Sequence, residues 1–98
     1  MLAIKQQVMQ VLPDATVILF GSQANNTANE ESDWDILVIT DRLLITNETK
    51  KIIHNRIFPL SVSIAAFINL VIVTKKDWQE NPSYYSLKQS VAFNNKAL

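Results

Sequence analysis

Short apolar runs separated by polar segments divide the chain into alternating helices and strands. The first ten residues place apolar side chains at helical spacing, and Pro13-Asp14 then ends the pattern, so we expect an N-terminal amphipathic helix. β-branched and apolar residues predict buried strands over 16–20 and 36–40. The polar stretch SQANNTANEES between them predicts a short helical turn followed by a loop.

The middle of the chain predicts one helix and one strand. Residues 47–57 have helical periodicity, with Thr46 or Asn47 as the N-cap, and Pro59 is expected to end the helix. The alternation in LSVSI then predicts a strand over 60–66 with its serines on one face.

The last third predicts a further strand over 70–73 and two helices. Thr74 resembles the start of a capping box, and Asn81-Pro82 begins the final helix. The order of elements predicts one α/β (α+β) domain over residues 1–98, with a mixed sheet of about four strands flanked by helices.

Composition limits the classes of protein and of metal site that fit. Apolar residues make up 48% and charged residues 18%, which is typical of a globular chain and not of a disordered one. The absence of cysteine excludes disulfides and thiolate metal sites. His54 is the single histidine, which disfavours a histidine zinc site, and we expect it on the surface of a helix.

Charge and hydropathy disfavour two classes of partner. Nine basic and nine acidic residues balance, so no net positive field attracts DNA or structured RNA. The uncharged stretch Leu60–Val73 is too short to span a bilayer and is better explained by buried strands. Because the N-terminus also lacks the layout of a signal peptide, we expect a soluble cytoplasmic protein.

The only glycine of the chain, Gly21, follows the apolar run VILF. Glycine suits a sharp turn from a buried strand because it tolerates positive φ and lets a ligand approach the backbone closely. Ser22 adds a hydroxyl and a backbone N–H, and amides at a helix start form a phosphate site. A turn that simply needs glycine is the alternative.

A pair of acids, Asp33 and Asp35, leads into the second apolar run. Side chains at i and i+2 of an extended backbone point to the same face, where two carboxylates repel each other unless a cation lies between them. Oxygen ligands of this kind suit Mg²⁺, which takes one or two carboxylates together with phosphate oxygens. The alternative is an exposed strand entry with two incidental aspartates.

Together these residues carry a resemblance. GSQANNTANEESDWDILV resembles the signature of the DNA polymerase β nucleotidyltransferase superfamily, most of all its minimal nucleotidyltransferase (MNT) domains: Gly-Ser, ten residues, Asp-x-Asp, then an apolar strand. VTKKDWQENPSYYSLKQSVAF is similar to the tail of one bacterial MNT subgroup. The resemblance implies that Gly21 and Ser22 hold the β- and γ-phosphates of ATP or another nucleoside triphosphate. It also implies that Asp33 and Asp35 bind Mg²⁺ and position the α-phosphate for attack by a hydroxyl.

The chain departs from the family pattern in two places. Gln23 and Asn25 stand where the family often has arginines, and Asn26 replaces a second glycine. The family also carries a third carboxylate on a later strand, whereas the later runs here offer serines and an asparagine. Losing general-base assistance typically slows transfer by about 10²–10⁴. The candidates for that position are Ser61, Ser63, Asn69 or a loop acid among Glu30, Glu31 and Asp77.

The remaining candidates favour structural roles. We expect Trp34 to point to the face opposite the aspartates and pack in the core. Lys75 and Lys76 are expected at a solvated helix start, with a phosphate contact as the alternative. Four aromatic residues are expected to pin the C-terminal helices onto the sheet: Trp78, Tyr84, Tyr85 and Phe93.

Two functions remain open at the level of sequence. The first is an enzyme that moves AMP or another nucleoside monophosphate onto a hydroxyl. Similar small proteins are antitoxins that adenylylate a HEPN-domain toxin, which implies a protein acceptor. The second is a degraded nucleotidyltransferase that acts by binding a partner. In either case, so small a chain predicts an acceptor surface supplied by a second subunit of a homo-oligomer or by a partner protein.

Overall fold

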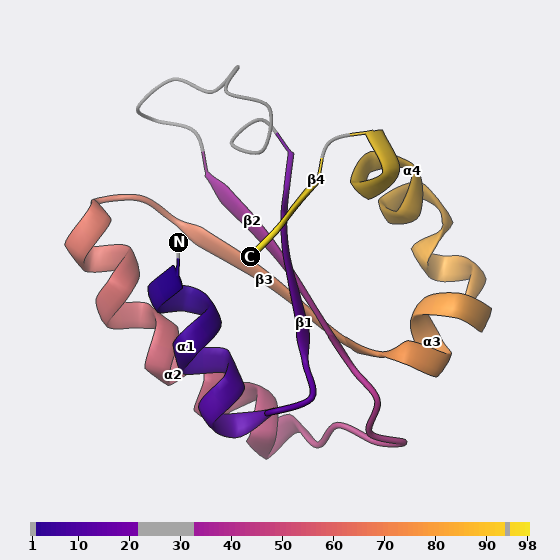
Figure 1. Cartoon of the computed structure of the whole chain (residues 1–98), viewed down its shortest axis with the longest axis horizontal. Helices are drawn as coiled ribbons and strands as arrows, with labels where there is room; N and C mark the ends of the chain where they lie inside the picture. The colour runs from indigo at the N-terminus through magenta and orange to yellow at the C-terminus, as the bar shows by residue number, and fades with distance from the viewer. Residues whose placement is uncertain (1, 22–32, 94) are drawn as a thin grey trace.

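The computed structural model describes residues 2–21, 33–93 and 95–98. A four-stranded sheet runs through the centre of the protein, and helices lie on both of its faces (Figure 1). Along the chain the elements are α1 (Leu2–Val11), β1 (Thr16–Phe20), β2 (Trp34–Thr40), α2 (Asn47–Ile64), β3 (Ile68–Thr74), α3 (Lys75–Glu80), the 3₁₀ helix η2 (Pro82–Tyr84), α4 (Tyr85–Phe93) and β4 (Asn95–Ala97).

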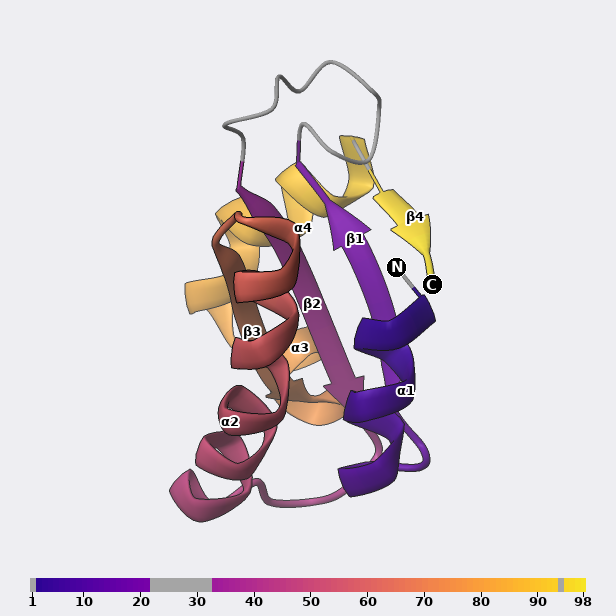
Figure 2. The ribbon, with the colours of Figure 1, turned by 90° about the vertical axis from the view of Figure 1, so that its left-hand side faces the viewer.

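The sheet is mixed, as the sequence predicts. Its strand order is β3-β2-β1-β4, with β2 and β3 parallel and the other two pairs antiparallel. As a consequence, the end of β1 and the beginnings of β2 and β3 lie at the same end of the sheet (Figure 2). The α+β fold class is confirmed.

Alternation along the strands builds two apolar layers. Even-numbered residues of β2 face α1 and α2, and Leu37 faces α3 and α4. Figures 1 and 2 show the two helix pairs on opposite sides of the sheet. The larger core cluster consists of Ile4, Val8, Leu12, Val17, Leu19, Ile36, Val38, Ile53, Ile57 and Ile72. The smaller one consists of Phe20, Leu37, Val73 and Val91.

Several predicted boundaries are confirmed. Helix α1 ends before Pro13, and β1 covers the predicted 16–20. Thr46 is the N-cap of α2, since its hydroxyl accepts a hydrogen bond from the Thr49 N–H at 3.1 Å. Thr74 caps α3 in the same way through the N–H of Asp77.

The prediction that Pro59 ends the helix is wrong, and so is the strand over 60–66. Helix α2 continues through Pro59 to Ile64 and ends at Ala65, whose φ of 54° is left-handed. Ile53, Ile57 and Leu60 continue one helical stripe against the large core across the proline. Burial of that stripe outweighs the hydrogen bond that proline removes. In the described ranges no helix, α2 included, combines the length and apolar character that crossing a membrane requires.

The C-terminal end differs from the prediction in two ways. Strand β4 was not expected, because its three residues are exposed and its sequence, NKA, has no strand pattern; it pairs with β1 and places Leu98 against the large core. Trp78 and Tyr84 pack on the small core as predicted. Tyr85 and Phe93, by contrast, are 67% and 84% exposed, because they lie out of phase with the buried side of α4.

Asp14 connects the turn after α1 to the end of β2. Its Oδ2 accepts hydrogen bonds from the hydroxyl of fully buried Thr40 at 2.8 Å and from the Asp41 N–H at 2.6 Å. These bonds, that from Thr40 first, lower the pKa of Asp14 below its usual value. A lowered pKa in the folded state means a stabilising contribution that is present above about pH 4 and lost as the pH falls through the folded pKa.

Asp14→Ala is therefore expected to lower the free energy of unfolding by about 1 kcal/mol at pH 7, a modest figure because the carboxylate is exposed to solvent. Urea unfolding at pH 7 and pH 3 measures it, and the difference from wild type should shrink at pH 3. Asp41→Ala is the matched control, since it removes an exposed carboxylate but keeps the N–H that Asp14 binds. A difference that is the same at both pH values would contradict this account.

Candidate active site

Of the predicted site residues, Gly21, Asp33 and Asp35 lie at the end of the sheet where β1 ends and β2 and β3 begin. In the strand register, Phe20 lies opposite Asp35, and Asp35 lies opposite Asn69. Gly21 directly follows Phe20, the last residue of β1, and Asp33 directly precedes β2. Three separate segments of the chain therefore bring Gly21, the two acids and Asn69 to one place.

The face of the sheet on which this cluster lies follows from the alternation of the strands. Asp35 is in phase with Leu37, and Asn69 is in phase with Val73, so both lie on the side of α3 and α4. Trp34 points the other way and packs against the large core, as predicted. Because Trp34 points into the core, its two neighbours in the sequence, Asp33 and Asp35, point to the other face of the sheet.

Asn69 lies between the two carboxylates. Its Nδ2 donates to Asp33 Oδ2 at 3.3 Å and to Asp35 Oδ1 at 3.2 Å. One polarised N–H₂ group is thus within hydrogen-bond reach of an oxygen from each acid. A small cation at this place can meet oxygens of both carboxylates, so the donor set, which is all oxygen apart from the amide nitrogen, fits Mg²⁺.

Gly21 is held against the same carboxylate pair. Its φ of 77° lies in the left-handed region, which a non-glycine residue rarely adopts. A Cβ at this position would lie only 2.6 Å from Asp35 Oδ2. The lone glycine of the sequence therefore meets two demands at once: the turn after β1 and the close approach of an acid.

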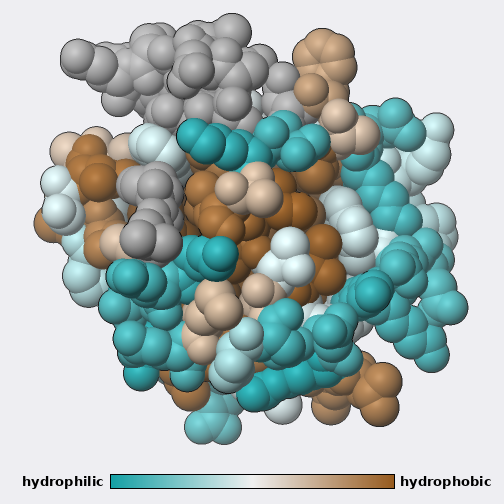
Figure 3. All heavy atoms as spheres, in the orientation of Figure 1, coloured by the Kyte–Doolittle hydropathy of each residue, from teal (hydrophilic) through white to brown (hydrophobic). Residues whose placement is uncertain are grey.

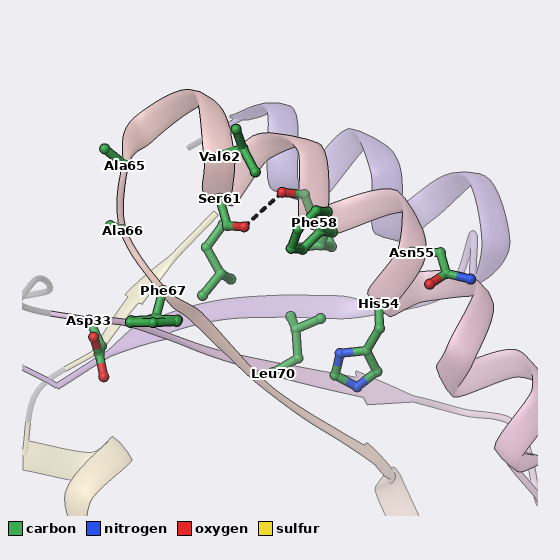
Figure 4. A pocket seen from close by; sticks show the side chains of 12 residues that line it. Asp33, His54, Asn55, Phe58, Ser61, Val62, Ala65, Ala66, Phe67 and Leu70 are labelled. Atoms are coloured by element: carbon green, nitrogen blue, oxygen red, sulfur yellow. Dashed lines mark hydrogen bonds between the residues drawn. The ribbon is translucent and has the colours of Figure 1, made fainter.

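The structure shows where some of the sequence candidates lie, whereas others fall outside the described residues. Ser22 lies outside the described residues, as do Gln23, Asn25, Asn26, Glu30 and Glu31. Ser61 and Ser63 are not on a strand beside the acids but on α2, where the Ser61 hydroxyl donates to the Phe58 carbonyl at 2.7 Å (Figure 4). Among the described candidates, Asn69 is the one that joins the aspartates.

The other polar candidates lie at the opposite end of the sheet. Asn69 stands near the start of β3, whereas Lys75 and Lys76 follow its end, about 20 Å away at roughly 3.3 Å per residue. Asp77 belongs to the first turn of α3 at that same end. Both lysines are exposed, as predicted for a solvated helix start. Within the described ranges, no three His, Cys, Asp or Glu side chains form a group able to hold a metal.

Two hollows adjoin the cluster from different sides. A hollow of about 720 Å³ lies between α2 and the start of β3, and it is lined by Asp33, Phe58, Val62 and Phe67 among others (Figure 4). In Figure 3 hydrophobic surface gathers at the left, over the end of α2 that leads into β3. Phe58, Val62 and Phe67 are 67%, 63% and 77% exposed. The sequence did not predict this surface, because it placed residues 60–66 in a strand.

The second hollow, of about 480 Å³, lies on the α4 side and is lined by Gly21, Gln89, Ser90 and Phe93. Gly21 thus borders the hollow on the α4 side, and Asp33 borders the hollow on the α2 side. A ligand that contacts Gly21 and a second one that contacts Asp33 can approach the acid pair from separate directions.

Comparison with solved structures supports the fold. A toxin–antitoxin complex crystallised with AMP-PNP matches 97% of this chain and 68% of its own, at 21% identity and a TM-score of 0.68. The MntA-HpeT toxin–antitoxin carrying the Y104A mutation matches at 22% identity and 0.66, over 97% and 68% of the two chains. A complex of tri-AMPylated Shewanella oneidensis HEPN toxin with MNT antitoxin matches at 19% identity and 0.59, over 96% and 64%.

No curated protein matches the chain closely enough to count as a relative. The model of the nucleotidyltransferase domain family, however, matches residues 3–85, which include the glycine turn, both aspartates and Asn69. The likeness in fold to toxin–antitoxin complexes, one of which contains an MNT antitoxin, agrees with that match. The chain belongs to the nucleotidyltransferase domain family.

Proposed function

We propose that this chain, as one domain over residues 1–98, transfers AMP from Mg-ATP to a hydroxyl group of a partner protein in the cytoplasm. Asp33 and Asp35 act as the metal ligands, and Gly21 and Ser22 hold the phosphates. The observation that carries the proposal is the convergence of Gly21, Asp33 and Asp35, with Asp35 Oδ2 against the glycine and one amide touching both acids.

Each residue has a distinct task in this reaction. Mg²⁺, when bound, supplies stabilisation of the attacking and leaving oxygens during the displacement. Asp33 and Asp35 supply the negative oxygens that hold it, and the i, i+2 spacing sets both on one face. Gly21 has no side chain, so phosphate oxygens can come close to the backbone amides of the turn.

The two hollows support an in-line arrangement of the substrates. In such a displacement the attacking and leaving oxygens lie on opposite sides of the phosphorus. The hollow at Gly21 suits the triphosphate, and the larger one at Asp33 suits the acceptor. Because the larger hollow is bordered by exposed Phe58 and Phe67, it favours a protein surface over a polynucleotide as acceptor. The neutral net charge agrees with that preference.

The solved neighbours support a proposal about the partner. They are toxin–antitoxin complexes, one with AMP-PNP and one with an AMPylated HEPN toxin. By analogy, we propose a HEPN-like helical protein as the acceptor of this chain.

A second candidate function rests on Asn69. An amide is not a base at neutral pH, so the residue of β3 beside the acids cannot take the proton of an acceptor hydroxyl. A chain of this kind could bind a partner, with or without Mg-ATP, and transfer nothing.

Incubation with Mg-ATP and the protein encoded by the neighbouring gene separates these functions. The enzyme is expected to release pyrophosphate and to leave the acceptor heavier by one AMP in mass spectrometry. Asp41→Asn, which changes an exposed acid beyond the far end of β2, serves as the matched control and should behave as wild type. ATP binding without pyrophosphate release, with the same affinity in Asp35→Asn, would instead support the binding module.

A further inference from the structure

Asn69 is an uncharged side chain that lies between the two acids at this end of the sheet. It is exposed, yet its single amide nitrogen contacts one oxygen of Asp33 and one of Asp35. No other side-chain donor among the described residues contacts either acid within hydrogen-bond distance. The N–H groups of this amide therefore offset part of the repulsion between the two neighbouring carboxylates.

The charge of the cluster sets how many cations it can hold. Two carboxylates carry a charge of −2, which one divalent ion neutralises, and the amide adds none. A second divalent ion at the same place would find no further anionic side chain in the described part of the chain, since no group of three acids or histidines forms there. The described residues by themselves thus provide for one ion.

We propose that Asn69 makes this a one-cation site: in the cation-free protein its amide occupies the place between the carboxylates that the divalent ion takes on binding. This inference rests on the proposed function, because it concerns the same two aspartates. It goes further by giving Asn69 a positioning role. The amide keeps the acids together before the ion arrives, and its neutrality sets the number of ions bound.

Asn69→Asp tests the inference because it changes an amide into an acid of nearly the same shape. A third carboxylate at this place adds a full negative charge beside the ion, so divalent-ion binding should tighten at least about tenfold. Without the ion, three acids repel one another and lose the bridging donor. The thermal midpoint of the variant should therefore fall below that of wild type in chelator and recover when the ion is added.

The experiment is calorimetric titration of the full chain with Mn²⁺ alone, without nucleotide. Asn47→Asp is the matched control, because it adds the same charge in the first turn of α2, at the far end of the sheet (Figure 2). Wild type is expected to bind one ion per chain, Asn69→Asp at least about tenfold more tightly, and the control within about twofold of wild type.

The outcomes separate failure of this inference from failure of the proposed function. If Asn69→Asp binds Mn²⁺ no better than Asn47→Asp, or if wild type binds two ions, the role of Asn69 is refuted while the aspartate site stands. If Asp35→Asn binds Mn²⁺ as tightly as wild type, or wild type binds none, the aspartates are not a metal site. The proposed function then fails together with the inference.

Discussion

Asp35→Asn is expected to lower the rate of the proposed AMP transfer by about 10³-fold. The substitution replaces one of two anionic oxygen ligands by a neutral amide while the shape of the side chain is kept. Metal stabilisation of the attacking and leaving oxygens contributes several kcal/mol, and each 1.4 kcal/mol corresponds to a factor of ten in rate. Steady-state pyrophosphate release at saturating Mg-ATP measures the loss, which should fall on kcat.

The fold of this variant should be intact. Asp35 is only half-buried, and the substitution removes repulsion between neighbouring acids, so the thermal midpoint without divalent ions should equal or exceed that of wild type. Asp33→Asn is expected to show a similar loss in rate, since both acids contact the same Asn69 amide. If the folded Asp35→Asn protein kept full activity, the proposed role of Asp35 in the reaction would be refuted.

The second large effect is expected at the glycine turn. Gly21→Ala should lower the free energy of unfolding by about 2–5 kcal/mol. About 1–2 kcal/mol of this comes from the left-handed backbone, whose φ is 77°. A further 1–3 kcal/mol, approximately, comes from the steric conflict of the new methyl group with Asp35 Oδ2, at 2.6 Å. Urea unfolding in the absence of divalent ions measures the sum.

A double-mutant cycle isolates the contact with the acid. In an Asp35→Ala background the methyl group meets no carboxylate, so Gly21→Ala should there cost only the backbone part, about 1–2 kcal/mol. Equal costs in the two backgrounds would show that the glycine serves the turn alone. The difference between the backgrounds is therefore a direct measure of how closely the turn and the acid are held together.

Local patterns predicted most of the elements that carry the site. The apolar run VILF indicated β1, the single glycine indicated the turn, and the i, i+2 spacing of Asp33 and Asp35 indicated a shared face. These inferences succeed because each depends on a few adjacent residues. The alternation of side chains along a strand and the backbone freedom of glycine are both properties of a few adjacent residues.

The errors of prediction involve segments whose structure depends on distant neighbours. Pro59 indicated a helix end, but burial of the stripe around it continues α2 to Ile64. The exposed residues of β4 carry no strand pattern and form a strand because β1 presents a free edge. The apolar hollow beside Asp33 was missed for the same reason as the helix, since its lining comes from the end of α2 and the start of β3.

By itself, the sequence determined the family, the glycine turn and the pair of acids, because these are written in residue types at short, regular spacing. Only the tertiary structure decided that Asn69, and neither serine of α2, lies between the acids. Parallel pairing of β2 with β3 brings Asp35 and Asn69 together across 34 positions of chain. Such a register is set by the packing of the whole sheet and its helices, which no local pattern contains.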